Sequence, residues 1–126
     1  MKKKILVVED EVVLQKAICK KLNCEGLESV CVRSVEDAET AMKEHEKISA
    51  VWLDHYLLGK ETGYDFVRKL KQSSKWKDLP IFVVSNTASP EKIEGYMELG
   101  VNNYFSKADN RLENIIASIK STLGNS

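Results

Sequence analysis

The stretch Ala50-Val51-Trp52-Leu53-Asp54 decides the fold, because it is a short apolar run that ends on a carboxylate. An apolar run of this length, without polar alternation, is typical of a strand covered on both faces, as in a parallel sheet. Asp54 then stands at the carboxyl end of the strand, the edge where open α/β sheets bind ligands. A single Asp at such a place most simply caps a turn. Its meaning therefore depends on which other reactive side chains reach the same edge.

Strand and helix patterns alternate on both sides of this run. Four other strand patterns cover residues 5–8, 29–32, 81–84 and 102–105. Each strand is followed by apolar residues at helical spacing, which begin at Val12 or after the capping candidates Ser34, Thr62, Ser89 and Asn110. Five alternations predict an α/β fold, a doubly wound parallel sheet with helices on both faces. In the flavodoxin-like strand order 2-1-3-4-5, the topological switch point falls between the first and third strands.

Size and charge exclude several classes of protein. The 126 residues suit one domain, 1–126, and 19 basic residues balance 19 acidic ones. This balance argues against direct nucleic acid binding, although the chain starts with lysines at positions 2–4. No apolar stretch reaches the length of a membrane span, and no signal peptide pattern is present. We therefore expect a cytoplasmic protein that has no contact with membranes.

The three cysteines, Cys19, Cys24 and Cys31, are odd in number and lack the paired short spacings of a zinc site. This pattern favours reduced, partly buried thiols over disulfides or metal ligands.

Reactive side chains follow four of the five predicted strands. Glu9 and Asp10 follow the first strand, Asp54 the third, Ser85 the fourth and Lys107 the fifth. Carboxylates gathered at one edge repel each other by about 4 kcal/mol per pair, at roughly 4 Å and an effective dielectric constant of about 20. A cation must relieve this repulsion, and oxygen ligands with room for water suit Mg²⁺. With an ammonium and a hydroxyl opposite, the group forms a cradle for a phosphoryl group on a carboxylate.

With these residues in this order, the sequence resembles a response-regulator receiver domain of two-component signalling, over essentially the whole chain. The resemblance implies that Asp54 accepts a phosphoryl group from the phosphohistidine of a histidine kinase or histidine phosphotransfer protein. It implies that Asp10 binds Mg²⁺ directly, together with Asp54 and the backbone carbonyl of Tyr56, while Glu9 acts mainly through water. The protein would then be a signalling switch that catalyses its own phosphorylation, not a classical enzyme.

The resemblance also assigns the residues of the switch. Lys107 and Ser85 would hold the phosphoryl oxygens, and Tyr104 matches the aromatic position whose ring moves with the hydroxyl of Ser85. Phosphorylation would thereby change the face formed by the last two helices and the fifth strand. Tyr56 and Thr87 occupy the positions that tune loss of the phosphoryl group. A phenol beside the acyl phosphate hinders water and threonine is no strong base, so we expect a long-lived phosphoprotein.

The sequence departs from the family pattern at three places. Ala108 follows Lys107 where the family usually has proline after a cis peptide; a cis bond before alanine costs about 3 to 4 kcal/mol, so we expect a trans loop or strain. This puts the placing of Lys107 in question. Leu57-Leu58-Gly59 replaces the common Met-Pro, in a loop that is one residue longer than in many members. Asn86 stands where a small residue is usual.

Three other interpretations of the sequence compete with this one. A haloacid-dehalogenase-type enzyme needs a second acid two residues after its nucleophile, where this chain has Tyr56. A flavodoxin-like cofactor site needs a phosphate loop, which Glu9-Asp10-Glu11 would repel. The remaining alternative is a degenerate receiver that works as a phosphorylation-independent interaction module. No output domain follows the last predicted helix, so a stand-alone regulator and the front of a longer protein both stay open, as does the downstream effector.

Overall fold

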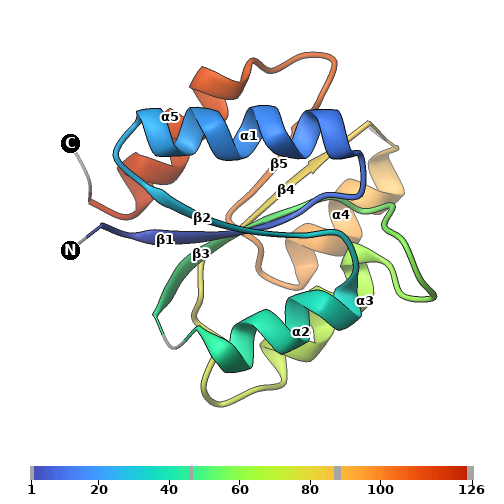
Figure 1. Ribbon diagram of the computed structural model, residues 1–126. Coiled ribbons are helices and arrows are strands. Elements are labelled where there is room, and N and C mark those ends of the chain that lie inside the picture. The colour runs from blue at the N-terminus through green and yellow to red at the C-terminus, as the bar shows by residue number, and fades with distance from the viewer. Residues whose placement is uncertain (1, 46, 87–88, 125–126) are drawn as a thin grey trace.

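The computed structural model describes residues 2–45, 47–86 and 89–124, which form one five-stranded sheet with helices on both faces (Figure 1). The strand order is β2-β1-β3-β4-β5 and every neighbouring pair is parallel, which confirms the predicted α/β fold. In chain order the elements are β1 (Lys4–Val8), α1 (Val12–Cys24), β2 (Glu28–Val32), α2 (Val35–Glu44), β3 (Ile48–Leu53), α3 (Gly63–Lys71), β4 (Ile81–Ser85), α4 (Pro90–Glu98), β5 (Asn103–Ser106) and α5 (Leu112–Thr122).

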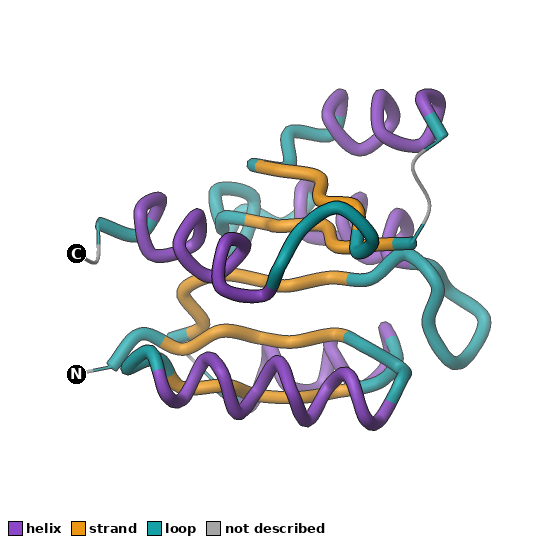
Figure 2. The backbone as a smooth tube through the Cα atoms, turned by 90° about the horizontal axis from the view of Figure 1, so that it is seen from above, coloured by secondary structure: helices purple, strands orange, loops and turns teal. Residues whose placement is uncertain are grey.

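The sheet separates two apolar cores. Helices α1 and α5 cover one face, and α2, α3 and α4 cover the other (Figures 1 and 2). Successive residues of β3 alternate between them, because side chains of a strand point to opposite faces. Trp52 packs in the core under α1 and α5, whereas Leu53 packs with Phe66 and Tyr96 in the other. The unbroken apolar runs of the sequence therefore reflect a sheet covered on both sides, and Trp52 is a core residue as predicted.

Polar caps fix where three of the helices begin. The side chains of Ser34, Thr62 and Ser89 each accept a hydrogen bond from the third residue of the helix that follows. The prediction that Asn110 caps the last helix is wrong. Arg111 is the N-cap of α5, and the amide of Asn110 donates to the carbonyl of Ser106 at 2.9 Å instead. Asn110 thus closes the loop after β5, a contact that competes with capping.

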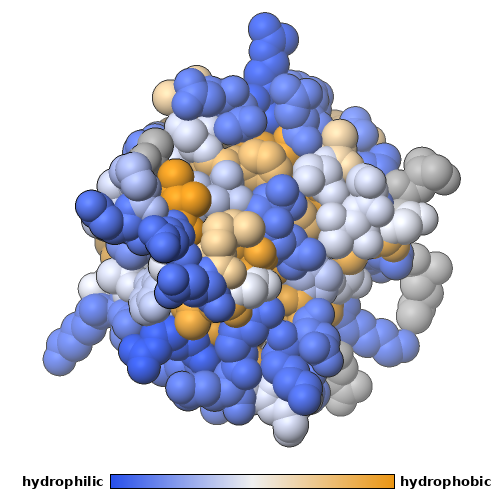
Figure 3. Space-filling view, turned by 180° about the vertical axis from the view of Figure 1, so that it is seen from behind, coloured by the Kyte–Doolittle hydropathy of each residue, from blue (hydrophilic) through white to orange (hydrophobic). Residues whose placement is uncertain are grey.

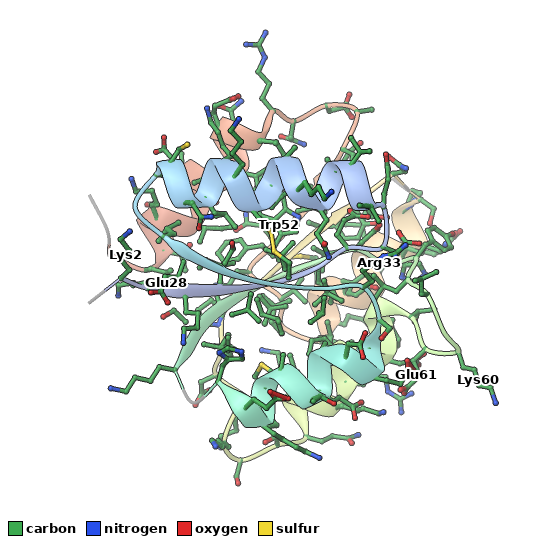
Figure 4. The ribbon with its side chains drawn as sticks, viewed as in Figure 1. Lys2, Glu28, Arg33, Trp52, Lys60 and Glu61 are labelled. Atoms are coloured by element: carbon green, nitrogen blue, oxygen red, sulfur yellow. A yellow bond between two sulfur atoms is a disulfide. The ribbon has the colours of Figure 1, made fainter. Side chains whose placement is uncertain are left out.

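The cysteines correct a second expectation. Cys19 of α1 and Cys31 of β2 are joined by a disulfide, so they are not reduced thiols, whereas Cys24 is free and exposed (Figure 4). An odd cysteine count does not exclude one pair. The pairing depends on the packing of α1 against β2, which brings the two Cα atoms to 7.1 Å.

Backbone hydrogen bonds extend the sheet one residue beyond the strands at the edge where the reactive groups gather. The N–H of Asp54 donates to the carbonyl of Val8 at 3.0 Å, and the N–H of Glu9 donates to that of Val32 at 3.0 Å. Across β4 and β5, the N–H of Lys107 donates to the carbonyl of Ser85 at 2.9 Å. These residues are held by the sheet itself and not by mobile loops.

The face of the molecule seen from behind is mostly polar (Figure 3). On the face opposite to that of Figure 1, apolar atoms show only between hydrophilic side chains (Figure 3). Within the part of the chain that the structure describes, no helix has the length and apolar character needed to cross a membrane.

Candidate functional site

Three carboxylates meet at the carboxyl edge of the sheet, as the sequence predicted. One oxygen from each of Glu9, Asp10 and Asp54 lies within 4.8 Å of the other two. Glu9 is fully buried and Asp54 is 5 % exposed, while Asp10 is half-buried at the rim. Because β1 and β3 are neighbours at the switch point, their first residues beyond the strands are brought side by side.

Lys107 bridges two of these acids. Its Nζ lies 2.8 Å from Oε1 of Glu9 and 3.0 Å from Oδ2 of Asp54. The lysine is itself largely buried, so the three groups form a compact charge cluster with little access to water. Lys107, whose placing Ala108 put in question, therefore does reach the cluster of acids.

Burial and charge act in opposite directions on these groups. Burial raises the pKa of Glu9 above its ordinary value, although hydrogen bonds from Lys107 and from the N–H of Glu11 oppose the rise. Burial lowers the pKa of Lys107, but its hydrogen bonds to Glu9 and the charge of Asp54 outweigh that effect and leave the pKa raised. The ammonium of Lys107 is therefore held firmly in its charged form.

Two polar residues that the sequence analysis did not single out hold the acidic loop. Nε of Arg33 donates to the backbone carbonyl of Asp10 at 3.0 Å, and Nε2 of Gln15 donates to the carbonyls of Glu9 and Val32 at 3.1 and 2.8 Å. Arg33 follows directly after β2, so its position at the same sheet edge was the available signal. Figure 4 shows Arg33 at this end of the sheet, with Lys60 extending outward from the loop after β3.

Ser85 and Tyr104 are joined as well. Ser85 is fully buried at the end of β4, and its hydroxyl hydrogen-bonds to Tyr104 of β5. Burial raises the pKa of Tyr104, and this hydrogen bond opposes the rise. The Tyr104 ring lies 5.6 Å from the ring of Tyr96 on α4, centroid to centroid. The predicted switch pair thus extends from Ser85, whose carbonyl accepts from the N–H of Lys107, to the ring of Tyr96 on the neighbouring helix.

Of the two predicted tuning residues, Tyr56 and Thr87, the structure describes only Tyr56. Tyr56 is 52 % exposed and its hydroxyl is hydrogen-bonded to Nζ of Lys92 on α4. Thr87 lies outside the described residues. Asn86 is exposed and follows Ser85 directly.

The loops that depart from the family pattern have ordinary backbone connections. Across residues 2–45, 47–86 and 89–124 no peptide bond is cis, so the chain takes the trans loop before Ala108. Leu58 pairs with Ser34 in an isolated bridge, and its N–H donates to the carbonyl of Arg33 at 3.3 Å. The longer loop after β3 is therefore anchored to the chain that follows β2.

The donor set decides what this site can hold. Oxygen ligands from three carboxylates, with the rim position of Asp10 open to water, suit a hard divalent cation. A carboxylate beside a fixed ammonium and a hydroxyl is also an arrangement in which a covalent acyl phosphate would be stabilised.

One buried polar contact does not follow from the sequence pattern. His55 comes directly after Asp54, and its Nδ1 lies 2.6 Å from the hydroxyl of Tyr96. The two residues are 41 positions apart, so neither spacing nor periodicity could pair them.

Known proteins match this chain along nearly all its length. The sequence model of the response regulator receiver domain matches residues 5–120. The phosphate regulon transcriptional regulatory protein PhoB of Escherichia coli is 27% identical over an alignment of 127 positions, which covers 98% of this chain and 52% of PhoB. The chemotaxis protein CheY1 of Helicobacter pylori is 28% identical over 109 residues, which cover 82% of this chain and 84% of CheY1. The chain therefore spans about half the length of PhoB.

Solved structures share the fold. A putative response regulator from Chloroflexus aurantiacus has a TM-score of 0.88 at 22% identity, over 99% of this chain and 100% of that one. The Mn(2+)-bound form of response regulator Rcp1 has a TM-score of 0.82 at 21% identity, over 98% of this chain and 96% of that one.

Proposed function

This chain belongs to the response regulator receiver family of two-component signalling, and from that premise we propose that Asp54 is its phosphoacceptor. Receiver domains are signalling phosphoacceptors and not classical enzymes, and they imply interaction with a histidine kinase. The observation that supports Asp54 most directly is its place beside Lys107, 3.0 Å away, within the cluster of acids. The donor would be a phosphohistidine on a histidine kinase or on a histidine phosphotransfer protein.

The reaction follows from the residues present. A carboxylate oxygen of Asp54 attacks the phosphorus, the P–N bond to the donor imidazole breaks, and a P–O bond forms to give an acyl phosphate. The imidazole nitrogen leaves with the electron pair of the P–N bond. Lys107 and the hydroxyl of Ser85 would then donate to the phosphoryl oxygens, where charge-assisted hydrogen bonds are strong.

The acids also fit Mg²⁺. Asp10 and Asp54 would bind it, the backbone carbonyl of Tyr56 would complete the protein ligands, and Glu9 would act mainly through water. When bound, the ion supplies positive charge that neutralises the phosphoryl oxygens. The response regulator Rcp1, which shares this fold, was solved in a Mn(2+)-bound form, which supports the proposal that this chain binds a divalent cation.

The signal would pass from Ser85 through Tyr104. Moving a two-state equilibrium from mostly inactive to mostly active takes about 5.5 kcal/mol of differential stabilisation, which several charge-assisted hydrogen bonds supply. The contact of Ser85 with Tyr104 supports this route to the face of α4, β5 and α5. An effector protein or an output domain would read that face.

A second function is favoured by one observation. Asp54 is 5 % exposed and already paired with Lys107, so the site is closed by its own ion pairs. A degenerate receiver that binds partners without being phosphorylated would keep such a closed site.

The test is phosphorylation by a small molecule with the cation present or removed. The protein is incubated with acetyl phosphate in Mg²⁺ or in EDTA, and intact masses are read promptly. We expect one phosphoryl group in Mg²⁺, located by peptide mapping to the segment that contains Asp54, and at least about a tenfold lower yield in EDTA. No adduct in either condition contradicts the phosphoacceptor and favours the interaction module.

The lifetime of the acyl phosphate is a separate prediction. After acetyl phosphate is removed, we expect the label to survive for many minutes, because the ring of Tyr56, two residues after Asp54, would hinder the approach of water. Tyr56→Ala should shorten the half-life by about five- to tenfold, the equivalent of roughly 1 kcal/mol in the hydrolysis barrier. The matched control is Leu58→Ala, which truncates another exposed apolar side chain of the same loop. Loss of most label from the unaltered protein within seconds would count against this shielding.

A further inference from the structure

The segment after the proposed phosphoacceptor is attached to α4 by side chains. Nδ1 of His55 lies 2.6 Å from the hydroxyl of Tyr96, which belongs to α4. His55 is 9 % exposed and Tyr96 is fully buried, so water does not compete for this bond. The two rings also meet edge to face, with centroids 5.7 Å apart.

Both groups of this hydrogen bond are uncharged or polar side chains that lie away from water. Burial raises the pKa of Tyr96, so its hydroxyl keeps its proton. Nδ1 of His55 donates or accepts in this bond according to the tautomer of the ring. In either case, removing the Tyr96 hydroxyl leaves a buried ring nitrogen without its partner.

A second contact lies beside the first. Nζ of Lys92 is hydrogen-bonded to the hydroxyl of Tyr56 and lies 4.5 Å from the centroid of its ring. Lys92 and Tyr96 are four residues apart in α4, so they share one face of the helix. Two consecutive residues after Asp54 thus contact successive turns of α4.

Backbone hydrogen bonds also restrain the segment that follows Asp54. The carbonyl of His55 accepts from the N–H of Gly63 at 2.9 Å, and the N–H of Asp54 is bonded into the sheet. A Cβ on Gly63 would lie 2.4 Å from the carbonyl oxygen of Asp54 and 3.0 Å from the Tyr96 hydroxyl. The Tyr96 hydroxyl is therefore packed close to the backbone of Asp54.

We propose that His55 is a positioning residue, whose hydrogen bond to Tyr96, with the Tyr56–Lys92 contact beside it, is a latch that couples Asp54 to α4. This coupling rests on the proposed function and adds a route to the one through Ser85 and Tyr104. Coupling between two sites is reciprocal. Releasing α4 from His55 should therefore change how Asp54 reacts, and phosphorylation of Asp54 should change how firmly α4 is held.

The decisive variant is Tyr96→Phe, which keeps the ring and removes the hydroxyl. Tyr64→Phe is the matched control, because Tyr64 lies edge-on to Tyr96 in the same aromatic group but is not bonded to His55. Hydrogen exchange is measured for the unaltered protein and both variants, first unphosphorylated and then with Mg²⁺ and acetyl phosphate. Phosphorylation rates are followed by intact mass.

In the unphosphorylated protein, Tyr96→Phe should speed exchange in both residues 54–63 and α4 by about tenfold, the effect of one lost buried hydrogen bond. Tyr64→Phe should leave residues 54–63 within about twofold of the unaltered protein. With acetyl phosphate, Tyr96→Phe should change the phosphorylation rate by about threefold or more and remove most of the change in α4 exchange.

The outcomes separate this latch from the function on which it rests. Equal exchange in residues 54–63 for the two variants overturns the latch, whatever happens to phosphorylation. Equal phosphorylation rates for both variants, with a full response of α4, also overturn it. If the unaltered protein takes up no phosphoryl group, the proposed function fails, and the coupling to phosphorylation fails with it. Exchange in the unphosphorylated variants then shows separately whether His55 and Tyr96 join the two segments.

Discussion

Protein carrying Asp54→Asn is expected to take up no phosphoryl group from acetyl phosphate and Mg²⁺. The amide has no anionic oxygen to attack phosphorus, so the yield should fall by at least about 1,000-fold, the scale seen when a nucleophile is removed. Intact mass gives the yield directly. The matched control is Asp109→Asn, an exposed residue of the loop after Lys107, which should be labelled like the unaltered protein.

This variant should keep its fold. Lys107 retains its ion pair with Glu9 at 2.8 Å, and one of three mutually repelling carboxylates is gone. We expect the free energy of unfolding in urea to stay level or to rise by about 1 kcal/mol, since functional sites hold unfavourable charge. A labelled Asp54→Asn protein would contradict the assignment and point to Glu9 or Asp10 as the acceptor.

Gly63→Ala is expected to lower the free energy of unfolding by about 2 to 4 kcal/mol, as overpacking against fixed backbone does. The added Cβ would lie 2.4 Å from the carbonyl oxygen of Asp54 and 3.2 Å from its carbonyl carbon. Neither atom can move away easily, because the residues on this backbone are fixed by the hydrogen bonds of the Asp54 N–H to β1 and of the His55 carbonyl to the N–H of Gly63. Urea titration measures the loss, and the displaced Asp54 should also be phosphorylated more slowly.

Gly95→Ala is the matched control and should act in the opposite direction. Its Cβ would meet only a ring carbon of Tyr64 at 3.5 Å, an ordinary contact. Because Gly95 lies inside α4, alanine there should raise the free energy of unfolding by about 0.5 to 1 kcal/mol. A loss at Gly95 as large as that at Gly63 would show that the close approach to Asp54 is not the cause.

The fold could be predicted from the sequence because the apolar pattern of each strand and helix indicates which of its faces is buried. The apolar run before Asp54 faces two cores, and the caps Ser34 and Thr62 act within one helical turn. The edge where Asp10, Asp54 and Lys107 meet also followed from the sequence, since the carboxyl ends of parallel strands lie together.

Side-chain contacts between elements that are distant in the sequence could not be predicted. Two such hydrogen bonds join His55 to Tyr96 and Arg33 to the carbonyl of Asp10. Both depend on how the helices and loops pack on the sheet. The disulfide between α1 and β2 has the same origin. The prediction that Asn110 caps the last helix failed for a local reason. The side chain of Asn110 has two possible sets of backbone partners, and periodicity cannot choose between them.

The backbone hydrogen bonds that carry Glu9, Asp54 and Lys107 one residue beyond their strands have a thermodynamic consequence. The backbone of these residues loses its conformational freedom when the sheet forms, so little backbone entropy is lost when a donor arrives. Displacing the backbone of Asp54 would require the central strands of the sheet to fray. Helix α4, in contrast, is held to the segment after Asp54 mainly by side-chain contacts. Under mild denaturation the reactive centre should therefore persist after the helix that reports on it has begun to open.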